Sequence, residues 1–141
     1  MKMNSIPTVG VLIFKDNKVL LVRHGEAAGH VTGSYGLPAG RIEKGETVKQ
    51  AALRELQEET GFITTEDNLE ELPLKILPAD IPRKDGTIKR FSITVFLCRK
   101  FSGKLITTEE SIPEWIEINS LDELHLIVNT KKIIEEGFKF I

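Results

Sequence analysis

The 141-residue chain lacks several features that would decide its class at once. Cys98 is the only cysteine, so no disulfide forms within the chain, and an apolar strand is its expected setting. The net charge of −2 gives no general attraction to nucleic acid or to an anionic membrane. No apolar run approaches the length of a membrane span, and residues 9–14 are too short for a signal core. We therefore expect a cytoplasmic protein with neither a nucleic-acid nor a membrane partner.

The length and an ordinary composition predict one domain, residues 1–141, with a core of its own. Apolar runs between turn signals predict strands over residues 8–14, 18–23, 35–37, 72–77, 81–84, 90–99 and 115–118. Helices are expected over residues 47–60, 121–126 and 130–136. Because strands and helices interleave without regular βαβ alternation, we predict an α/β fold, with a mixed sheet and helices on both faces.

The helix over residues 47–60 has both of its ends marked in the sequence. Thr47 and Gln50 have the spacing of a capping box, in which each side chain accepts a hydrogen bond from the other residue's backbone N–H. Gly61 suits the left-handed residue that closes a helix. These local signals predict the helix and its limits.

The far end of this helix carries an acidic stripe. At about 100° per residue, Glu55, Glu58 and Glu59 fall within the same arc as the apolar Ala52 and Leu56. Carboxylates three and four residues apart repel each other, and the C-terminal end of a helix disfavours anions. Such an unfavourable arrangement is typical of a functional site, and a hard cation such as Mg²⁺ would compensate it. The alternative is a solvated helix surface with basic partners.

The residues in and before the helix form a recognisable pattern. Gly40 is followed after five residues by Glu46 and after seven more by the segment RELQEETGF, residues 54–62. This pattern resembles the complete signature of the Nudix hydrolases, and every fixed position is filled. The resemblance implies an α/β/α sandwich with a mixed sheet, and it disfavours the solvated-surface alternative.

The resemblance also implies a chemistry. Nudix enzymes hydrolyse a phosphoanhydride bond in a nucleoside diphosphate linked to another group, with Mg²⁺ as cofactor and Mn²⁺ as a substitute. Glu55, Glu58 and Glu59 match the metal-ligand glutamates of the signature, and the Ala39 carbonyl matches a further ligand. Arg54 resembles the arginine that holds the acidic cluster in place; its alternative role is a surface partner of Glu58. Glu55, Glu58 and Arg54 are thus the catalytic candidates within the signature.

The general base is not fixed by the signature. Some relatives use a helix glutamate, and others use an acid from a later loop. Glu109, Glu110 and Glu114 lie in such a loop, and Glu110 is our candidate. Its alternative is an exposed loop acid without a catalytic role. Glu46 is expected to order the loop against the helix.

Three residues are candidates for substrate binding. Arg23 ends a predicted strand and has the fork geometry for a phosphate, with a surface ion pair as the alternative. Tyr35 is a candidate for stacking on a base, with a core or edge tyrosine as the alternative. Asn129 matches an asparagine that reads the purine in the nucleoside-triphosphate branch of the family, and it is equally an N-cap candidate.

The layout of residues 109–129 resembles that triphosphate branch, so a nucleoside triphosphate is the expected substrate, with NMP and pyrophosphate as products. The sequence Pro38-Ala39-Gly40 is instead frequent among hydrolases of ADP-ribose and nucleotide sugars, which makes those compounds the alternative. Those enzymes usually carry an acid where Leu37 stands. Homodimers are common in the family.

Two other functions have sequence support. A Nudix fold can serve as a nucleotide-sensing module, but such modules typically lose catalytic glutamates that are present here. The segment Arg23-His24-Gly25-Glu26 resembles the motif of histidine phosphatases. That mechanism needs a second histidine in a similar setting, whereas His125 lies in a leucine-rich helical context.

Overall fold

The computed structural model describes residues 4–141. Nine strands form the sheets: β1 (Ile6–Leu12), β2 (Phe14–Lys15), β3 (Lys18–His24), β4 (Tyr35–Gly36), β5 (Ala39–Arg41), β6 (Leu69–Glu71), β7 (Ala79–Pro82), β8 (Ile88–Cys98) and β9 (Ser111–Glu117). The helices are α1 (Val48–Thr60), α2 (Thr130–Phe138) and the 3₁₀ turns η1 (Glu66–Asn68) and η2 (Ile118–Glu123). Within residues 4–141, none of these helices is long and apolar enough to cross a bilayer.

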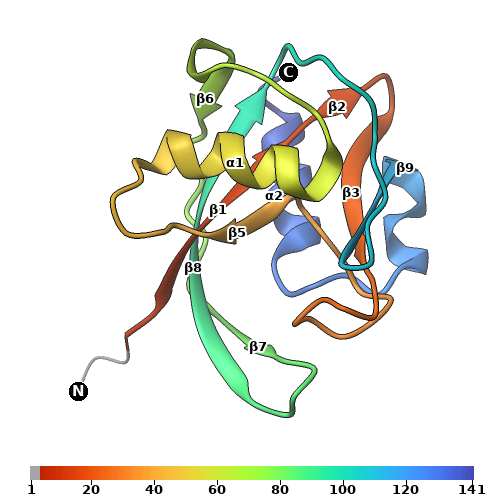
Figure 1. Cartoon of the computed structure of the whole chain (residues 1–141). Helices are drawn as coiled ribbons and strands as arrows, with labels where there is room; N and C mark the ends of the chain where they lie inside the picture. Colours follow the sequence, from red (N-terminus) through yellow and green to blue (C-terminus); the bar gives the residue numbers. More distant parts are fainter. Residues whose placement is uncertain (1–3) are drawn as a thin grey trace.

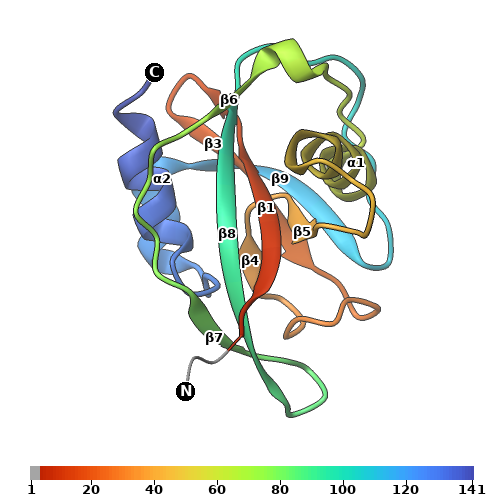
Figure 2. The same ribbon diagram turned by 90° about the vertical axis from the view of Figure 1, so that its left-hand side faces the viewer.

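The strands form two sheets between the two α-helices (Figures 1 and 2). One sheet has the order β5-β1-β8-β6, with β7 also paired to β8, and the other has β3 flanked by β2, β4 and β9. β1 runs parallel to β8 and antiparallel to β5, so the first sheet is mixed. Figure 2 shows α1 and α2 on opposite sides of the sheets. The expected α/β fold with a mixed sheet and helices on both faces is confirmed.

Each helix covers its own part of the core. Ala51, Ala52 and Leu56 of α1 are fully buried against β1 and β8, and Ile133 and Ile134 of α2 are buried in a second cluster on the other side. Burying a leucine or isoleucine side chain contributes about 1.5–3 kcal/mol. This packing fixes the angle at which α1 presents its other residues.

The limits of α1 follow the sequence signals. The Thr47 hydroxyl accepts a hydrogen bond from the Gln50 N–H at 3.1 Å, and the Gln50 side chain accepts one from the Thr47 N–H at 2.9 Å. Gly61 has a φ of 88° and donates to the Gln57 carbonyl at 2.9 Å. The capped helix is confirmed, with Thr47 as its N-cap. Cys98 is buried at the end of β8, as expected.

Two expected elements are wrong. Residues 72–77 form no strand, although their burial alternates, because Pro73 lacks an N–H and the segment makes no ladder with β8 beyond the Leu72 N–H bond to the Val95 carbonyl at 2.9 Å. Leu72, Leu74 and Ile76 pack into the α2-side cluster instead. Residues 121–126 form no α-helix, since the chain there makes the shorter 3₁₀ turn η2.

β7 and β8 form a hairpin that extends beyond the rest of the sheet (Figure 1). Its turn contains the expected Asp85-Gly86 pair, and Gly86 has a φ of 89°. The hairpin contacts the loop after β3, where the Lys84 N–H donates to the Gly29 carbonyl at 3.0 Å. Arg83 is thereby carried to the loop that borders the acidic end of α1.

Candidate active site

The acidic stripe of α1 opens into a pocket. Four carboxylates line it, and so do a serine and two histidines from neighbouring loops and strands: Glu55, Glu58, Glu59, Glu110, Ser111, His24 and His30. Residues 28 and 29 complete the wall. We call this the carboxylate pocket. It brings together the three signature glutamates and the loop acid that the sequence named separately.

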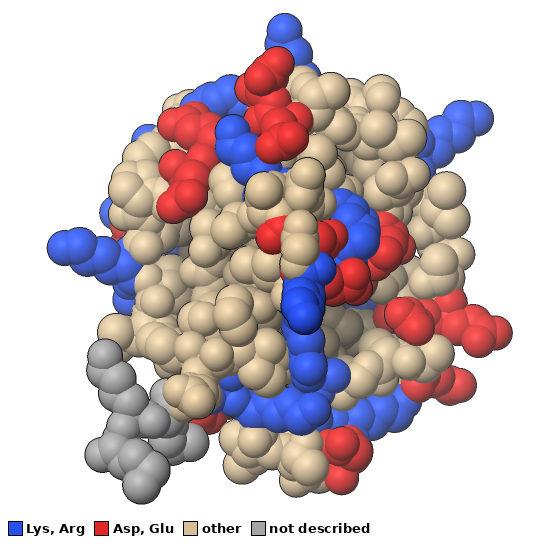
Figure 3. Space-filling model, turned by 60° about the vertical axis from the view of Figure 1, so that its left-hand side comes forward, with Lys and Arg blue, Asp and Glu red and all other residues tan. Residues whose placement is uncertain are grey.

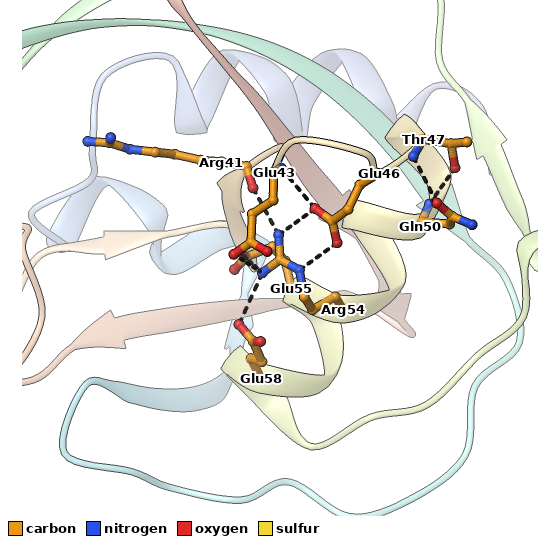
Figure 4. Close-up of polar contacts among 8 residues, drawn as sticks. All are labelled: Arg41, Glu43, Glu46, Thr47, Gln50, Arg54, Glu55 and Glu58. Carbon is orange, nitrogen blue, oxygen red and sulfur yellow. Dashed lines mark hydrogen bonds and ion pairs between the residues drawn. The ribbon is translucent and has the colours of Figure 1, made fainter.

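Arg54 lies at the centre of the acidic network (Figure 4). Its guanidinium donates to Glu46 at 2.7 and 2.8 Å, to Glu55 at 2.7 Å and to Glu58 at 3.2 Å. It also donates to the Arg41 carbonyl at 3.0 Å. The bond from Arg54 lowers the pKa of Glu46 to about 2, and the pKa of Arg54 is raised in turn. Arg54 therefore ties the motif loop to two helix carboxylates, and the pairing with Glu58 is one contact among several.

Glu55 lies directly against the backbone of Gly40. Its side chain is 13% exposed, and burial raises its pKa. A Cβ atom on Gly40 would lie only 2.1 Å from the Glu55 Cδ atom. Position 40 therefore has room for no side chain while Glu55 keeps this position.

Glu59 is held from two sides. Its carboxylate accepts a hydrogen bond from the Ser111 hydroxyl, which the sequence did not single out. Burial raises its pKa to about 7, and bonds from Ser111 and from the Ala39 backbone oppose that rise. The Ala39 backbone N–H thus lies beside the Glu59 carboxylate.

The carboxylates fit a divalent cation by their chemistry. As they stand, no three His, Cys, Asp or Glu side chains of residues 4–141 converge closely enough to hold an ion. Glu58 is turned to Arg54, and Glu59 is turned to Ser111. Glu58 is 59% exposed, so its side chain has room to rotate. Clustered oxygen donors, two of them with pKa values raised by burial, are what Mg²⁺ binds and stabilises.

A second cavity, of about 230 Å³, adjoins the carboxylate pocket and shares His24 and His30 with it. We call it the apolar cavity, because most of its wall is aliphatic or aromatic: Leu37, Ile81, Phe91, Ile93, Ile127 and Ile133. Its charged and amide groups are Arg41, Arg83 and Asn129. Its size and lining suit a flat ring with a few polar edges.

The sequence missed the polar groups between the two spaces. Arg83 donates toward the ring nitrogens of His30 at 3.2 Å. Burial, His24 and the two nearby arginines lower the pKa of His30 to about 4. His24 is buried, its pKa is lowered by burial, and its Nδ1 lies 2.9 Å from the Ser34 carbonyl. No local sequence pattern predicts that these side chains lie together, because Arg83 reaches the histidines only where the β7–β8 hairpin contacts the loop after β3.

The three substrate-binding candidates lie in different places. Arg23 and the Tyr35 hydroxyl both contact Glu114, at 3.3 and 2.8 Å, and neither lines the carboxylate pocket or the apolar cavity. These are the surface-pair and edge-tyrosine alternatives. Asn129 occupies the N-cap position of α2 with a φ of 74°, but its side chain makes no capping bond. It lines the apolar cavity and donates to the Leu77 carbonyl at 3.2 Å.

Comparison with known proteins identifies relatives of the whole chain. The sequence model of the NUDIX domain matches residues 4–138. An ADP-ribose pyrophosphatase of Methanocaldococcus jannaschii is 33% identical over 137 residues, which cover 95% of this chain and 75% of that protein. An 8-oxo-dGTP diphosphatase of Proteus vulgaris is 35% identical over 85 residues, or 60% of this chain and 71% of that one.

A solved structure agrees in fold. The MutT/nudix family protein from Enterococcus faecalis superposes with a TM-score of 0.72 at 20% identity, covering 99% of this chain and 62% of that one. The chain spans a smaller share, between 20% and 36%, of three other curated relatives.

Proposed function

The chain belongs to the Nudix family of nucleotide pyrophosphohydrolases, and on this premise we propose that its preferred substrate is a nucleoside triphosphate, cleaved to NMP and pyrophosphate. The observation that carries the proposal is the junction of the carboxylate pocket with the apolar cavity. When the diphosphate of a nucleotide occupies the carboxylate pocket, its base is within reach of the apolar cavity. There Asn129 offers an amide donor and acceptor to the edge of a purine.

The proposed mechanism assigns a task to each group. Glu55, Glu58, Glu59 and the Ala39 carbonyl would hold Mg²⁺, or Mn²⁺ in its place. The ion would supply neutralisation of the phosphate charge and a lower pKa of bound water. Arg54 fixes the orientation of Glu55 and Glu58.

The reaction itself is a substitution at phosphorus. Glu110 accepts a proton from the attacking water, whose oxygen forms a new bond to phosphorus. The bond from that phosphorus to the bridging oxygen breaks, and the second phosphorylated product leaves with the electron pair. Glu110 suits the role of base because it lines the same pocket as the helix glutamates.

ADP-ribose is the second candidate substrate. The archaeal relative matched over 95% of this chain is named an ADP-ribose pyrophosphatase, and the Pro38-Ala39-Gly40 sequence favours the same class. The name of the Proteus relative, an 8-oxo-dGTP diphosphatase, favours a triphosphate.

Chromatography of the products separates the two substrates. The enzyme is incubated with Mg²⁺ and one compound at a time, either a nucleoside triphosphate, ADP-ribose or a nucleotide sugar. NMP plus pyrophosphate at the highest kcat/KM supports the triphosphate proposal. AMP plus ribose 5-phosphate at the highest kcat/KM would replace it with the ADP-ribose alternative. A chain that binds these compounds without turnover would be a sensing module.

A further inference from the structure

We propose that Arg41 and Arg83, on the wall of the apolar cavity, form an anion-binding pair that holds phosphate oxygens of the substrate. The inference rests on the proposed function for the identity of the ligand as a nucleotide. It assigns to Arg41 and Arg83 the phosphate contact that was expected of Arg23 from the sequence. Both lie outside the fixed positions of the family signature.

Among the arginines that the structure describes, Arg41 and Arg83 are the two that form no ion pair with a carboxylate. Arg23, Arg54, Arg90 and Arg99 each form an ion pair with a carboxylate. Within residues 4–141, neither Arg41 nor Arg83 has such a pair, and no Asp or Glu lines the apolar cavity.

The side chains are also brought together. The Arg83 guanidinium lies 5.7 Å from the centre of the Phe91 ring, and that of Arg41 lies 5.9 Å from the same centre. The shared ring positions both groups through cation–π contacts. Burial, and then the charge of Arg41, lower the pKa of Arg83, and the charge of Asp85 opposes this shift. Two cations beside one ring repel each other, the charge of Asp85 offsets only part of this cost at Arg83, and a bound anion would remove more of it.

Both arginines line the apolar cavity, and Arg83 lies at its border with the carboxylate pocket, where it contacts His30. A Cβ atom on Gly29 would lie 2.0 Å from an Arg83 nitrogen, and Gly29 and His30 line the carboxylate pocket. Arg41 lines the apolar cavity, and its side chain extends away from the network of Arg54 and its carboxylates (Figure 4). Figure 3 shows basic side chains running down the centre of one face directly beside a group of acidic ones, with a hollow next to them. A diphosphate that runs from the carboxylates toward the apolar cavity therefore passes Arg83 first, beside Gly29 and His30, and Arg41 lies farther along, on the wall of that cavity.

The charge of the pair suits phosphate. A guanidinium binds a phosphate through two parallel hydrogen bonds, which also orients it. The neighbouring His24 and His30 have lowered pKa values, so the arginines supply the positive charge on this side at neutral pH. In the alternative arrangement, the guanidinium groups of Arg41 and Arg83 stack on the base of the nucleotide instead of binding its phosphates.

Calorimetric titration in EDTA tests the pair without metal or turnover. The ligands are inorganic pyrophosphate, ADP and adenosine; the proteins are the wild type, Arg83→Gln, Arg41→Gln and Arg83→Lys, with Arg23→Gln as the matched control. We expect each Gln variant to raise the dissociation constants of pyrophosphate and ADP about tenfold, as loss of a charged hydrogen bond does. Adenosine binding and the Arg23→Gln variant stay unchanged, and Arg83→Lys recovers part of the loss.

Several outcomes would contradict the proposal that Arg41 and Arg83 bind an anion together. They are unchanged ADP binding in both Gln variants, an equal loss for adenosine and ADP, and no pyrophosphate binding by the wild type. The result is separable from the proposed function. Hydrolysis with a normal KM in Arg83→Gln refutes the pair alone, whereas Arg83-dependent pyrophosphate binding by a chain that hydrolyses no nucleotide refutes the proposed function alone.

Discussion

The Arg54 guanidinium donates to both carboxylate oxygens of Glu46, at 2.7 and 2.8 Å. The same group reaches Glu55 at 2.7 Å. A residue of the motif loop thereby fixes the arginine that orients a carboxylate of the pocket (Figure 4). The two signature positions, eight residues apart, are thus joined by a positioning contact.

Replacing Glu46 tests this positioning role. Glu46→Gln keeps the size of the side chain but removes the charge that binds Arg54, so Glu55 loses its fixed orientation. We expect Mg²⁺ affinity and kcat to fall about 10–100-fold, as for partners of metal ligands elsewhere. Glu43→Gln is the matched control, because Glu43 is exposed and 3.8 Å from Arg54. Equal effects of the two variants, measured by steady-state kinetics against Mg²⁺ concentration, would contradict the role.

Glu58→Gln tests the metal site itself. The change removes a carboxylate that we propose as a ligand, and we expect the loss of several kcal/mol of charge stabilisation to lower kcat by about 100-fold or more. The fold is unaffected because the side chain is 59% exposed. Glu66→Gln, on the exposed turn η1, is the control. Near-normal turnover of Glu58→Gln at saturating Mg²⁺ would refute Glu58 as a ligand.

Gly40→Ala tests the close approach of Glu55. The added Cβ would meet the Glu55 carboxylate, which is the end of a flexible side chain and moves away. We expect at least a tenfold loss of kcat, since small displacements of catalytic groups have effects of that order. Thermal unfolding followed by circular dichroism should show a midpoint close to the wild type. An active variant would mean that Glu55 tolerates another position.

The lowered pKa of His30 predicts that the folded protein loses stability in acid. Its folded-state pKa of about 4 lies below the ordinary 6.5, so the unfolded chain binds its proton more tightly. The contribution of His30 is complete above pH 6.5 and is lost as the pH falls toward 4. After allowance for solvent screening, the loss is about 1 kcal/mol.

Urea unfolding at pH 7 and pH 4.5 measures this effect. The decrease in unfolding free energy should be smaller in His30→Gln than in the wild type. His125→Gln is the control, because His125 lies outside both spaces that His30 lines. The same decrease in the wild type and in His30→Gln would contradict the lowered pKa.

The sequence predicted what depends on near neighbours. The capping pair of Thr47 and Gln50, the closing Gly61 and the acidic stripe all belong to one helix, so the signals and the structure they produce are local. The mixed sheet followed from the irregular alternation of strands and helices. Residues 72–77 misled because their alternation arises from packing under α2 rather than from a strand ladder.

Local sequence patterns could not predict the polar side chains between the carboxylate pocket and the apolar cavity. Arg83 contacts His30, which lies 53 positions away in the sequence, because the β7–β8 hairpin packs against the loop after β3. Ser111 contacts Glu59, which lies 52 positions away. Arg23 was a reasonable phosphate candidate from its place at a strand end, but the strand directs it to Glu114. Strand order and side-chain direction decide such contacts, and neither is written in a short motif.

The most direct test of the account is quantitative product analysis of a nucleoside triphosphate incubated with the wild type, with and without Mg²⁺, and with Glu58→Gln. Hydrolysis by the carboxylate pocket predicts NMP and pyrophosphate in equal amounts from the wild type with Mg²⁺. It predicts almost none of either product in EDTA or from Glu58→Gln. Equal product formation in all three samples, or its absence from all while nucleotide binding persists, would contradict it.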